Sequence, residues 1–540
     1  MGMSCENEFD DLPLDYYNVD DVMTDSVFVM GLINDMYNDL PDGYNRLGGN
    51  SMLAAATDEA VQSGNPTEAE YMATGAWSAS SLRDDAWGSS YAAIRKINQF
   101  LNELYPEIPE RLFRSERTVE LLVGQSYFLR AFFYFELVKR YGGVPIITEV
   151  LESGQGTDIG RDTYDDCINF IVEECDKAAE ILPVEWENSS RNFGRATKGA
   201  ALALKARTLL YAASPLFNDP SATENTLEHG AYSDDKWQKA AQAAYDVISM
   251  DVYELFIDYG AFFTFLMNNN EVIFSKMDGR NNDVERLNGP TSFTGGRGGS
   301  CPTLDLVDAY QMADGSPFDW SNPDHARNPF DNREYRFYTS VIYNGATWME
   351  SEIHTYEGGK DLGSVNSTKT GFYLKKFMSE EAKWFGGATG NALHCFPFIR
   401  YAEILLNYAE AMNEAYGPEN SGPFDLTALD AINEVRSRAF LPPLPAGLTK
   451  EEMREKIQHE RRIELAFEEH RNFDVRRWKL AESVFGEPVH GLKIVLNNDQ
   501  TYTYERVVAQ ERVFRPEMYL YPIPQSEINR NSRLVQNSGW

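Results

Sequence analysis

The densest group of reactive side chains in the sequence lies at residues 468–478, which read EEHRNFDVRRW. Carboxylates, guanidinium groups, an imidazole and an indole so close together could support acid–base catalysis or contacts with a nucleic acid. A structural interpretation accounts for the same residues. At a helix end, the two leading glutamates can pair with Arg471, Arg476 and Arg477, while the phenylalanine and tryptophan rings are buried. We therefore interpret the segment as part of the scaffold and expect function elsewhere.

Metal and phosphate sites are not indicated by the motifs that come nearest to them. His459 begins the string HERRI, but a zinc-protease helix needs a second histidine four residues later, where this chain has Ile463. His470 lies about 16 Å further along a helix, too far to share an ion. The run GGRGGS at 295–300 lacks the lysine of a phosphate-binding loop, and no G-x-S-x-G motif occurs. The sequence therefore predicts no metal site, no cofactor and no catalytic motif, and it does not decide whether an ion such as calcium is bound.

Charge limits the classes of function that are open to this chain. Its 83 acidic residues against 49 basic ones give a formal net charge of −34. Duplex binding draws its affinity from lysine and arginine at phosphates, so this balance argues against nucleic acid as a partner. A glycoside hydrolase with paired carboxylates stays open, because such a pair is recognised by its separation. In so acidic a chain, most carboxylates are expected to be solvated surface groups.

The cysteines form no recognisable disulfide or zinc framework. Cys167 and Cys175 fall on one expected helix, where eight residues separate them by roughly 12 Å, too far for a disulfide. The opening string MGMSCENEFDD reads as if a leader had been replaced by Met-Gly, with Cys5 near a former processing point. A chance surface cysteine is the alternative. No apolar run approaches the ~20 residues of a membrane-spanning helix.

Helix-period segments dominate the chain, so we expect a mainly α fold. At 540 residues the chain exceeds the usual limit of about 250–300 for one compact core, which predicts two lobes or one elongated array. The acidic stretch 6–24 is expected to be a tether. The expected helices span approximately 25–39, 81–104, 118–141, 162–182, 198–213, 234–250, 398–416, 425–440 and 449–470.

Several expected helices alternate small and large apolar residues. KGAALALKARTLLYAA at 198–213 and DDKWQKAAQAAYDVISM at 234–250 form one pair, and RYAEILLNYAEAMNEA at 400–415 with LTALDAINEVRSRA at 426–439 forms another. Small residues let helices approach closely, so each hairpin can stack on the next. The pairs resemble tetratricopeptide units, although the fixed 34-residue period is absent. Two regions, 40–80 and 277–395, instead suggest long irregular loops, which in a large globular protein are often functional.

Five motifs, in order along the chain, resemble the SusD/RagB family of outer-membrane nutrient-binding lipoproteins. They are LRAFFYFELVKRYGGVPII (129–147), PTLDLVDAYQMADG (302–315), RYAEILLNYAEAMNEA (400–415), ERRIELAFEEHRNFDVRRWK (460–479) and LYPIPQSEINRNSRLVQNSGW (520–540). The resemblance covers nearly the whole chain. It implies a mainly α, SusD-like fold, in which tetratricopeptide-like helical hairpins form a right-handed superhelical scaffold beside an irregular, loop-rich lobe.

The same resemblance implies a location and partners. Members of the family are surface lipoproteins of the outer membrane that cap a SusC-like, TonB-dependent transporter and pass glycans to it. Cys5 matches the lipidated position, and the acidic residues 6–11 resemble the surface-export signal, provided that a leader has been removed. The expected division is a tether at 1–24 and one SusD-like domain at 25–540, with a helical scaffold mainly at 81–250 and 398–479 and a ligand lobe at 40–80 and 277–395.

A glycan site needs flat aromatic side chains against the apolar faces of sugar rings, with amides, carboxylates and guanidinium groups at the hydroxyls. Two stretches offer both: YMATGAWSASSLRDD at 71–85 and the loop-rich region 277–395. We predict that Trp77 and Trp320 stack on sugars and that Arg83 and Asn281 bond hydroxyls. The other predicted site residues are Tyr71, Trp348 and Phe293. For each aromatic residue, partial core burial is the alternative. Three further tryptophans are expected to pack in the core: Trp87, Trp237 and Trp478.

The leading hypothesis is noncatalytic capture of an oligo- or polysaccharide at the cell surface. A peptide-capturing, RagB-like member of the same family is the second hypothesis, because helical repeats also bind peptides. A glycoside hydrolase on a helical scaffold is the third. The identity of the sugar and its linkage depend on the placement of loop residues in space, which the sequence does not specify.

Overall fold

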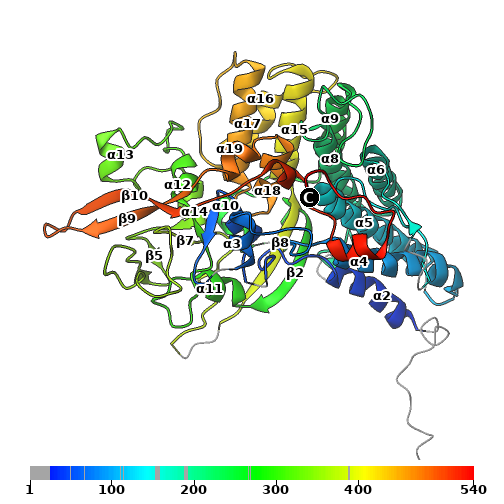
Figure 1. Cartoon of the computed structure of the whole chain (residues 1–540), viewed down its shortest axis with the longest axis horizontal. Coiled ribbons are helices and arrows are strands. Elements are labelled where there is room, and N and C mark those ends of the chain that lie inside the picture. Colours follow the sequence, from blue (N-terminus) through cyan, green and yellow to red (C-terminus); the bar gives the residue numbers. More distant parts are fainter. Residues whose placement is uncertain are drawn as a thin grey trace, which may run out of the picture.

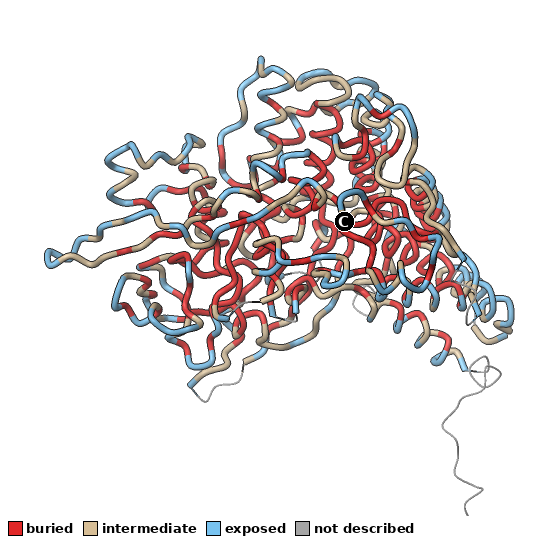
Figure 2. The backbone as a smooth tube through the Cα atoms, viewed as in Figure 1, coloured by how far each residue is buried: buried red, intermediate tan, exposed pale blue. Residues whose placement is uncertain are grey.

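Long helices gather in one half of the molecule, and short strands and loops make up most of the other half (Figure 1). The computed structural model describes residues 25–540 except 49, 66, 110, 114, 153–157, 188–191, 266, 268 and 387–389. Cys5 and the expected tether at 1–24 lie outside the described residues. Most buried residues form a main hydrophobic core that continues through both halves, from Val29 to Leu534, and a small second cluster includes Val475, Ala481 and Phe485 (Figure 2). The predicted mainly α fold is confirmed.

Each helix predicted from periodicity is present. The largest differences are at 81–86, which is a loop leading into α4, and at 465–469, where the chain turns after α17. Positive φ angles at Asp84 (51°), Phe467 (66°) and Glu469 (67°) account for both differences, because an α-helix cannot continue through that region of backbone space. The long helices are α2 (Ser26–Asn38), α4 (Trp87–Gln99), α5 (Glu116–Tyr141), α6 (Tyr164–Ile181), α8 (Lys198–Ala213), α9 (Asp235–Ile248), α15 (Tyr401–Tyr416), α16 (Ala428–Arg438), α17 (Lys450–Glu464) and α18 (His470–Arg477).

Consecutive long helices pack against each other as the sequence predicts. Helix α5 contacts α6, α8 contacts α9, and α15 contacts α9, α16 and α17. The small buried residues of α8, such as Gly199, Ala200 and Ala203, permit close approach of its neighbours. Capping boxes at Thr427 and Thr449 fix the starts of α16 and α17. The helix pairs expected at 198–250 and 400–439 are therefore present.

Short strands and short helices, joined by loops, make up the rest of the described chain. The strands pair antiparallel in twos, β1 with β3, β2 with β8, β4 with β7, β5 with β6 and β9 with β10. The strands are β1 (Ala60–Gln62), β2 (Val272–Asn281), β3 (Ser300–Pro302), β4 (Val341–Ile342), β5 (Thr347–Trp348), β6 (Ser351–Glu352), β7 (Tyr373–Leu374), β8 (Ala392–Arg400), β9 (Val489–Leu496) and β10 (Tyr502–Gln510). The short helices are α3 (Glu68–Ala73), α10 (Tyr259–Phe262), α11 (Asp283–Asn288), α12 (Leu304–Ala309), α13 (Pro323–Arg327), α14 (Tyr335–Ser340), α19 (Ala481–Phe485) and α20 (Gln525–Arg530), with single turns at η1 (Leu53–Ala56), η2 (Phe100–Leu104), η3 (Tyr105–Glu107) and η5 (Pro516–Tyr519).

The segment 468–478 belongs to the scaffold, as predicted, but its ion pairs differ from the predicted ones. Because the backbone turns at Glu469, the two glutamates precede α18 rather than lie on its face. The rings of Phe473 and Trp478 are buried, as expected. The charged groups bind distant partners: Glu468 binds Lys376 and Arg400, Glu469 lies near Arg46, Arg471 binds Asp58, and Arg477 binds Glu410 and Asp474.

Two of these partners, Lys376 and Arg400, belong to a buried ionic cluster that joins α17 to the strand-rich half. Arg400, at the end of β8, donates to Glu271 and Glu464 at 2.7 Å each and to Glu468 at 2.6 Å. Arg336 of α14 binds Glu464 from the other side at 2.9 Å. The described members of this cluster include as many cationic side chains as carboxylates. The members of this Arg400 cluster, each at most 8% exposed, are Glu271, Glu334, Arg336, Lys376, Arg400, Arg436, Arg438, Glu460, Glu464 and Glu468.

Glu59 is a buried carboxyl group outside this cluster. Its Oε2 accepts from the Phe467 amide at 3.4 Å, and its Oε1 has no hydrogen-bond partner among the described residues. Burial, together with the nearby charge of Asp58, raises the pKa of Glu59 from 4.5 to about 8. Between these two values the folded chain retains a proton that the unfolded chain has lost. Glu59 therefore lowers stability as pH rises through that window, by up to about 1.4 kcal/mol per pH unit.

Glu59→Gln should remove this pH dependence, because an amide stays neutral throughout the window. We expect the variant to gain stability relative to the wild type between pH 5 and pH 8, with little difference at pH 5. Urea unfolding of both proteins at the two pH values measures the gain. A stability difference that is the same at pH 5 and pH 8 would contradict the prediction.

Candidate ligand-binding site

Tyr71 is presented to solvent by the short helix α3. Ala69, Met72 and Ala73 form the buried face of this helix, which contacts η1 and β1. Tyr71 lies on the opposite face and is 39% exposed, unlike most large apolar residues of the chain. The spacing of small apolar residues in EAEYMA thus fixes which face is buried and leaves the tyrosine ring outside.

Arg83 covers part of the Tyr71 ring. Its guanidinium carbon lies 4.8 Å from the ring centroid, and its Nη1 donates to Glu68 Oε2 at 2.6 Å. Lys369 approaches from the loop-rich region, with its Nζ 3.6 Å from Glu70 Oε2. We call Tyr71, Arg83, Glu68, Glu70 and Lys369 the Tyr71 surface. It combines an exposed aromatic ring with charged groups that can form hydrogen bonds with hydroxyls, the two features that a glycan site needs.

A cleft of about 430 Å³ adjoins this surface and is lined by Arg83 and Glu68, with residues of 39–48 and 82–90. Its other cation is Arg46, which donates to Asp84 at 2.7 Å and to Glu136 at 3.2 Å. Two buried N–H groups in this lining, Nη1 of Arg46 and Nε of Arg83, have no hydrogen-bond partner among the described residues. We call this the Arg83 cleft. Nη1 of Arg46 still lies 3.9 Å from Glu469 Oε2, so Nε of Arg83 is the donor that best suits an acceptor oxygen of a polar ligand.

The innermost carboxylates of the Arg83 cleft are held by cations. Asp84 is shared between Arg46 and Arg140, and these two cations hold its pKa below the ordinary value although burial opposes the shift. Glu136 likewise binds Arg140 and Lys139. Both carboxylates are therefore already tied in ion pairs. The cleft offers polar groups to a ligand, and the Tyr71 ring lies beside the cleft, next to Arg83, rather than in its lining.

Three predicted site residues are corrected by their burial. Trp77 is 4% exposed, and its ring packs against Tyr521 and Trp540 with centroids 5.2 and 4.8 Å away. Trp348 is 1% exposed and Phe293 is 7% exposed. A ring enclosed by protein has no free face for a sugar, so the expectation that Trp77 stacks on a ligand does not hold in this structure.

The other two predicted residues, Trp320 and Asn281, make their contacts away from the Tyr71 surface. Trp320 is half-buried, donates its indole N–H to Asp308 at 3.1 Å, and contacts Phe318 and Tyr504. Asn281, at the end of β2, bonds locally to Asp278 and the Asp283 amide. The structure therefore brings together Tyr71 and Arg83. That Trp320 and Asn281 contact a glycan remains a proposal, separate from the Tyr71 surface.

Sequence reasoning missed Glu68, Arg46 and Lys369. Glu68 carried a usable signal, because it precedes Tyr71 by three residues and so shares its face on a helix. Arg46 and Lys369 reach the site from distant parts of the chain, which no local pattern indicates. The core positions expected for Trp87 and Trp478 are confirmed, and Trp237 packs against the core while only partly buried. Within the described ranges, no group of His, Cys, Asp and Glu side chains is arranged to hold a metal ion.

Comparison with known protein families gives matches along most of the chain. The model of the SusD family matches residues 269–540, half of the chain. The chain belongs to the SusD family. A second family model, described as starch-binding associating with outer membrane, matches residues 14–210. In the part of the chain that the structure describes, no helix is long and apolar enough to cross a membrane.

Individual SusD-like proteins resemble the chain in sequence and in fold. The SusD-like protein P2 of Formosa agariphila is 27% identical over 481 residues, covering 84% of this chain and 79% of that protein. A SusD-like protein of Bacteroides fragilis has 29% identity and a TM-score of 0.79, covering 96% of this chain and 98% of the other. A SusD-like carbohydrate binding protein from the same species has 25% identity and a TM-score of 0.78, covering 95% and 100%.

Proposed function

We propose that this SusD-family protein is a noncatalytic, surface-exposed binder of oligo- or polysaccharides that delivers them to a SusC-like, TonB-dependent transporter in the outer membrane. The observation that carries the proposal is the exposed Tyr71 ring, covered in part by Arg83, whose Nε has no hydrogen-bond partner among the described residues. Support also comes from the carbohydrate-binding description of a relative and from the outer-membrane description of the second family model. In this proposal Cys5 carries the lipid anchor.

The ligand site proposed for this function is the Tyr71 surface with the Arg83 cleft. An aromatic ring offers a flat apolar face to the C–H groups of a sugar, and the guanidinium groups of Arg83 and Arg46 donate to its oxygens. We assign Tyr71, Arg46 and Lys369 to the proposed lobe of 40–80 and 277–395, because Lys369 of the second stretch reaches Glu70 of the first, and Arg83 reaches the site from the start of the proposed scaffold. In this proposal the helices of 81–250 and 398–479 form the scaffold, and η1 and β1 contact α3 directly.

Tyr71→Ala and Arg83→Ala should each weaken glycan retention by about tenfold or more, since each removes either the stacking face or a charged hydrogen bond. Affinity electrophoresis against immobilised plant, microbial and host polysaccharides measures the effect. Tyr105→Ala is the matched control, because Tyr105 is also 39% exposed but lies outside the Tyr71 surface. We expect its mobility shift to equal that of the wild type.

Other outcomes distinguish the alternative functions. If Tyr71→Ala and Arg83→Ala both leave glycan retention unchanged, the protein binds glycans but the Tyr71 surface is not the site. Retention of peptides but of no glycan would favour a peptide-capturing member of the family. Release of shorter products from a bound oligosaccharide, abolished by one carboxylate substitution, would identify a glycoside hydrolase.

A further inference from the structure

A groove separate from the site described above lies between the C-terminal end of α2, the connection from α6 to α8, and β2. It consists of two adjoining pockets of about 510 and 330 Å³, which share the lining residues Phe193, Gly194, Arg195 and Ser275. We call it the Arg195 groove. Its large arm extends toward the residues after α9, and its small arm lies against α2. No residue of the Tyr71 surface or the Arg83 cleft lines it.

A tight turn at residues 192–195, NFGR, builds the wall that the two arms share. The Arg195 amide donates to the Asn192 carbonyl oxygen at 3.1 Å, and Gly194 has a φ angle of 82°. Glycine suits this position because a side chain disfavours positive φ. The turn packs on β2, since a Cβ atom at Gly194 would lie 3.4 Å from the Ser275 carbonyl oxygen. Phe193 and Arg195, on either side of the glycine, are each half-buried in the wall.

The charge of Arg195 has no carboxylate within ion-pair distance among the described residues. Its Nη1 donates to Gln125 Oε1 at 2.9 Å, and its Nη2 donates to Asn34 Oδ1 at 2.6 Å. Its guanidinium carbon lies 5.9 Å from the centroid of the Tyr37 ring. These partners are uncharged, so they orient the guanidinium group without neutralising it. A guanidinium group has more N–H donors than these two bonds use, so Arg195 can still pair with the carboxylate of a ligand.

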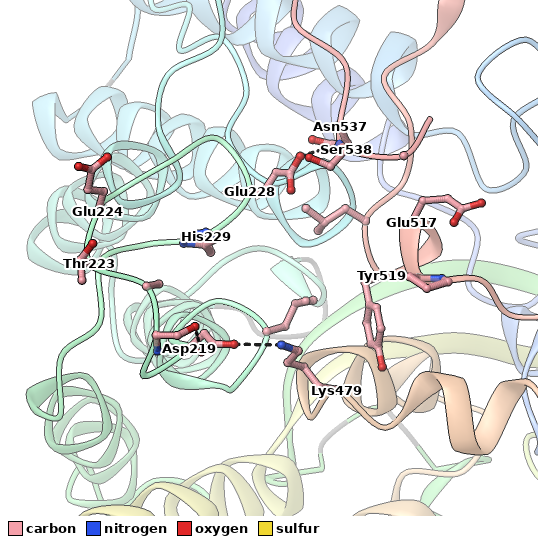
Figure 3. Close-up of a pocket in the computed structure, with 16 residues that line it drawn as sticks. Asp219, Thr223, Glu224, Glu228, His229, Lys479, Glu517, Tyr519, Asn537 and Ser538 are labelled. Atoms are coloured by element: carbon pink, nitrogen blue, oxygen red, sulfur yellow. Dashed lines mark hydrogen bonds and ion pairs between the residues drawn. The ribbon is translucent and has the colours of Figure 1, made fainter.

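Two other lysines that line pockets have carboxylates nearby. Lys276 lies in the small arm, where burial lowers its pKa and neighbouring carboxylates, chiefly Asp42, oppose that shift. Figure 3 shows another case beside the end of the chain. There Lys479 points at Asp219, in a pocket of about 710 Å³, and binds it at 3.0 Å. Arg195 is therefore the cation of the groove that is best placed to pair with an anionic group of a ligand.

Aromatic side chains line the large arm of the groove. They are Trp186, Phe193 and Tyr253, each half-buried. The indole N–H of Trp186 donates to the Ala196 carbonyl oxygen at 2.9 Å, which fixes the orientation of the ring. A small carboxylate uses none of this apolar surface. A sugar ring uses it through its C–H face, as in other aromatic-lined sites.

Amide oxygens and a carboxylate complete the large arm. The Nδ2 of Asn192 donates to the Glu187 carbonyl oxygen at 2.8 Å, and the Nδ2 of Asn270 lies 3.4 Å from Glu254 Oε1. Among the described residues no donor reaches the Oδ1 atom of either amide, so both oxygens can accept from hydroxyls of a ligand. Glu185, an exposed lining residue, disfavours a second anionic group here. The large arm therefore suits a neutral sugar unit.

We propose that the Arg195 groove is a second ligand site, which binds an oligosaccharide that contains a uronic acid. The uronate carboxylate pairs with the guanidinium group of Arg195. A neutral sugar beside it packs on Trp186 and Phe193, and its hydroxyls donate to the amide oxygens of the large arm. The inference rests on the proposed function, because it extends glycan binding to acidic sugars at a site separate from the Tyr71 surface.

Titration calorimetry with oligosaccharides prepared from pectin, glucuronoxylan, alginate and hyaluronan tests this proposal. The wild type should bind at least one of them, and the methyl ester of that oligosaccharide should bind about tenfold more weakly, because the ester has no charge to pair with Arg195. Arg195→Gln should weaken binding of the acid about tenfold. Arg195→Lys, which keeps the charge, should lose less affinity.

Two matched controls remove other cations. Lys479→Gln removes a pocket cation that a carboxylate already binds (Figure 3). Arg280→Gln removes an exposed arginine that has no ion pair among the described residues and donates to the Asn391 carbonyl oxygen. The affinity of both variants should equal that of the wild type. Trp186→Ala should weaken the acid and its methyl ester alike, because stacking does not depend on the charge of the sugar.

Four results would overturn the proposal: no uronate oligosaccharide bound by the wild type, equal binding of the methyl ester, full affinity in a folded Arg195→Gln variant, or equally tight binding of a glutamate tetrapeptide. Circular dichroism shows whether each variant is folded. If Arg195→Gln is not, the acid and its methyl ester are compared on the wild type and on Arg195→Lys, and equal affinities of the two ligands overturn the proposal.

Tyr71→Ala separates the two sites. If it abolishes retention of a neutral polysaccharide and leaves uronate binding unchanged, both proposals stand. If it abolishes uronate binding while Arg195→Gln does not, the acidic sugar lies at the Tyr71 surface and the groove proposal fails. If Arg195→Gln weakens uronate binding while Tyr71→Ala and Arg83→Ala leave all polysaccharide retention unchanged, the Tyr71 proposal fails and the Arg195 groove remains.

Discussion

Replacing Arg400 with methionine should lower the free energy of unfolding by about 3–5 kcal/mol, a large share of the roughly 5–15 kcal/mol available to a folded protein. Arg400 donates to three buried carboxylates, those of Glu271, Glu464 and Glu468, at 2.6–2.7 Å. Methionine fills a similar volume but leaves these charges without their shared cation. Repulsion between the three carboxylates, together with their incomplete solvation, lowers the free energy of unfolding of the variant. Urea unfolding followed by circular dichroism at pH 7 measures the loss.

Arg327→Met provides the matched control for this substitution. Arg327 also pairs with a carboxylate, Asp324 at 3.4 Å, but the two side chains are 71% and 87% exposed. An exposed pair contributes little, so we expect a change within about 0.5 kcal/mol. If Arg400→Met costs less than about 1 kcal/mol, the carboxylates of the Arg400 cluster are protonated or reached by water in the variant, and the cluster does not hold the two halves together.

The scaffold could be predicted from the sequence because its signals are local. Apolar residues at helical spacing, threonines before the first turn and small residues at the contacts all lie within one helix. The ion pairs of 468–478 could not be assigned in the same way. Arg471 binds Asp58, 413 residues earlier in the chain, and only the folded structure shows which carboxylate is near. Residue types predicted a buried ionic segment, whereas the partners depended on tertiary packing.

The candidate ligand site likewise combines residues that a local sequence pattern indicates with residues that only the folded structure brings close. Tyr71 and Arg83 are close in sequence, and an aromatic residue near an arginine in an irregular stretch was enough to select both. Arg46 and Lys369 reach the site from distant segments, so they carried no signal. Only its residue type indicates Trp77 as a stacking residue, because an irregular stretch has no periodicity from which the burial of a side chain can be predicted. Its real environment is set by the end of the chain, where Trp540 packs on it.

Trp77→Ala should therefore destabilise the protein, by about 3–5 kcal/mol, as large-to-small substitutions of buried aromatic residues do. The ring is 4% exposed and contacts Tyr521 and Trp540, so its removal leaves a cavity beneath the chain terminus. At temperatures where the variant is still folded, glycan retention should stay within about twofold of the wild type, because Tyr71 and Arg83 do not depend on this ring for their exposed contacts. Urea unfolding and affinity electrophoresis of the same preparation measure the two quantities.

Trp77→Phe distinguishes packing from hydrogen bonding at this position. Phenylalanine keeps an aromatic ring against Tyr521, and the indole N–H that it removes has no hydrogen-bond partner among the described residues. We therefore expect a loss of stability clearly smaller than for Trp77→Ala. The opposite pattern, with Trp77→Ala as stable as the wild type but no longer retained by a glycan that the wild type binds, would place Trp77 in the ligand site. The Trp77 ring would then have to leave the core on binding.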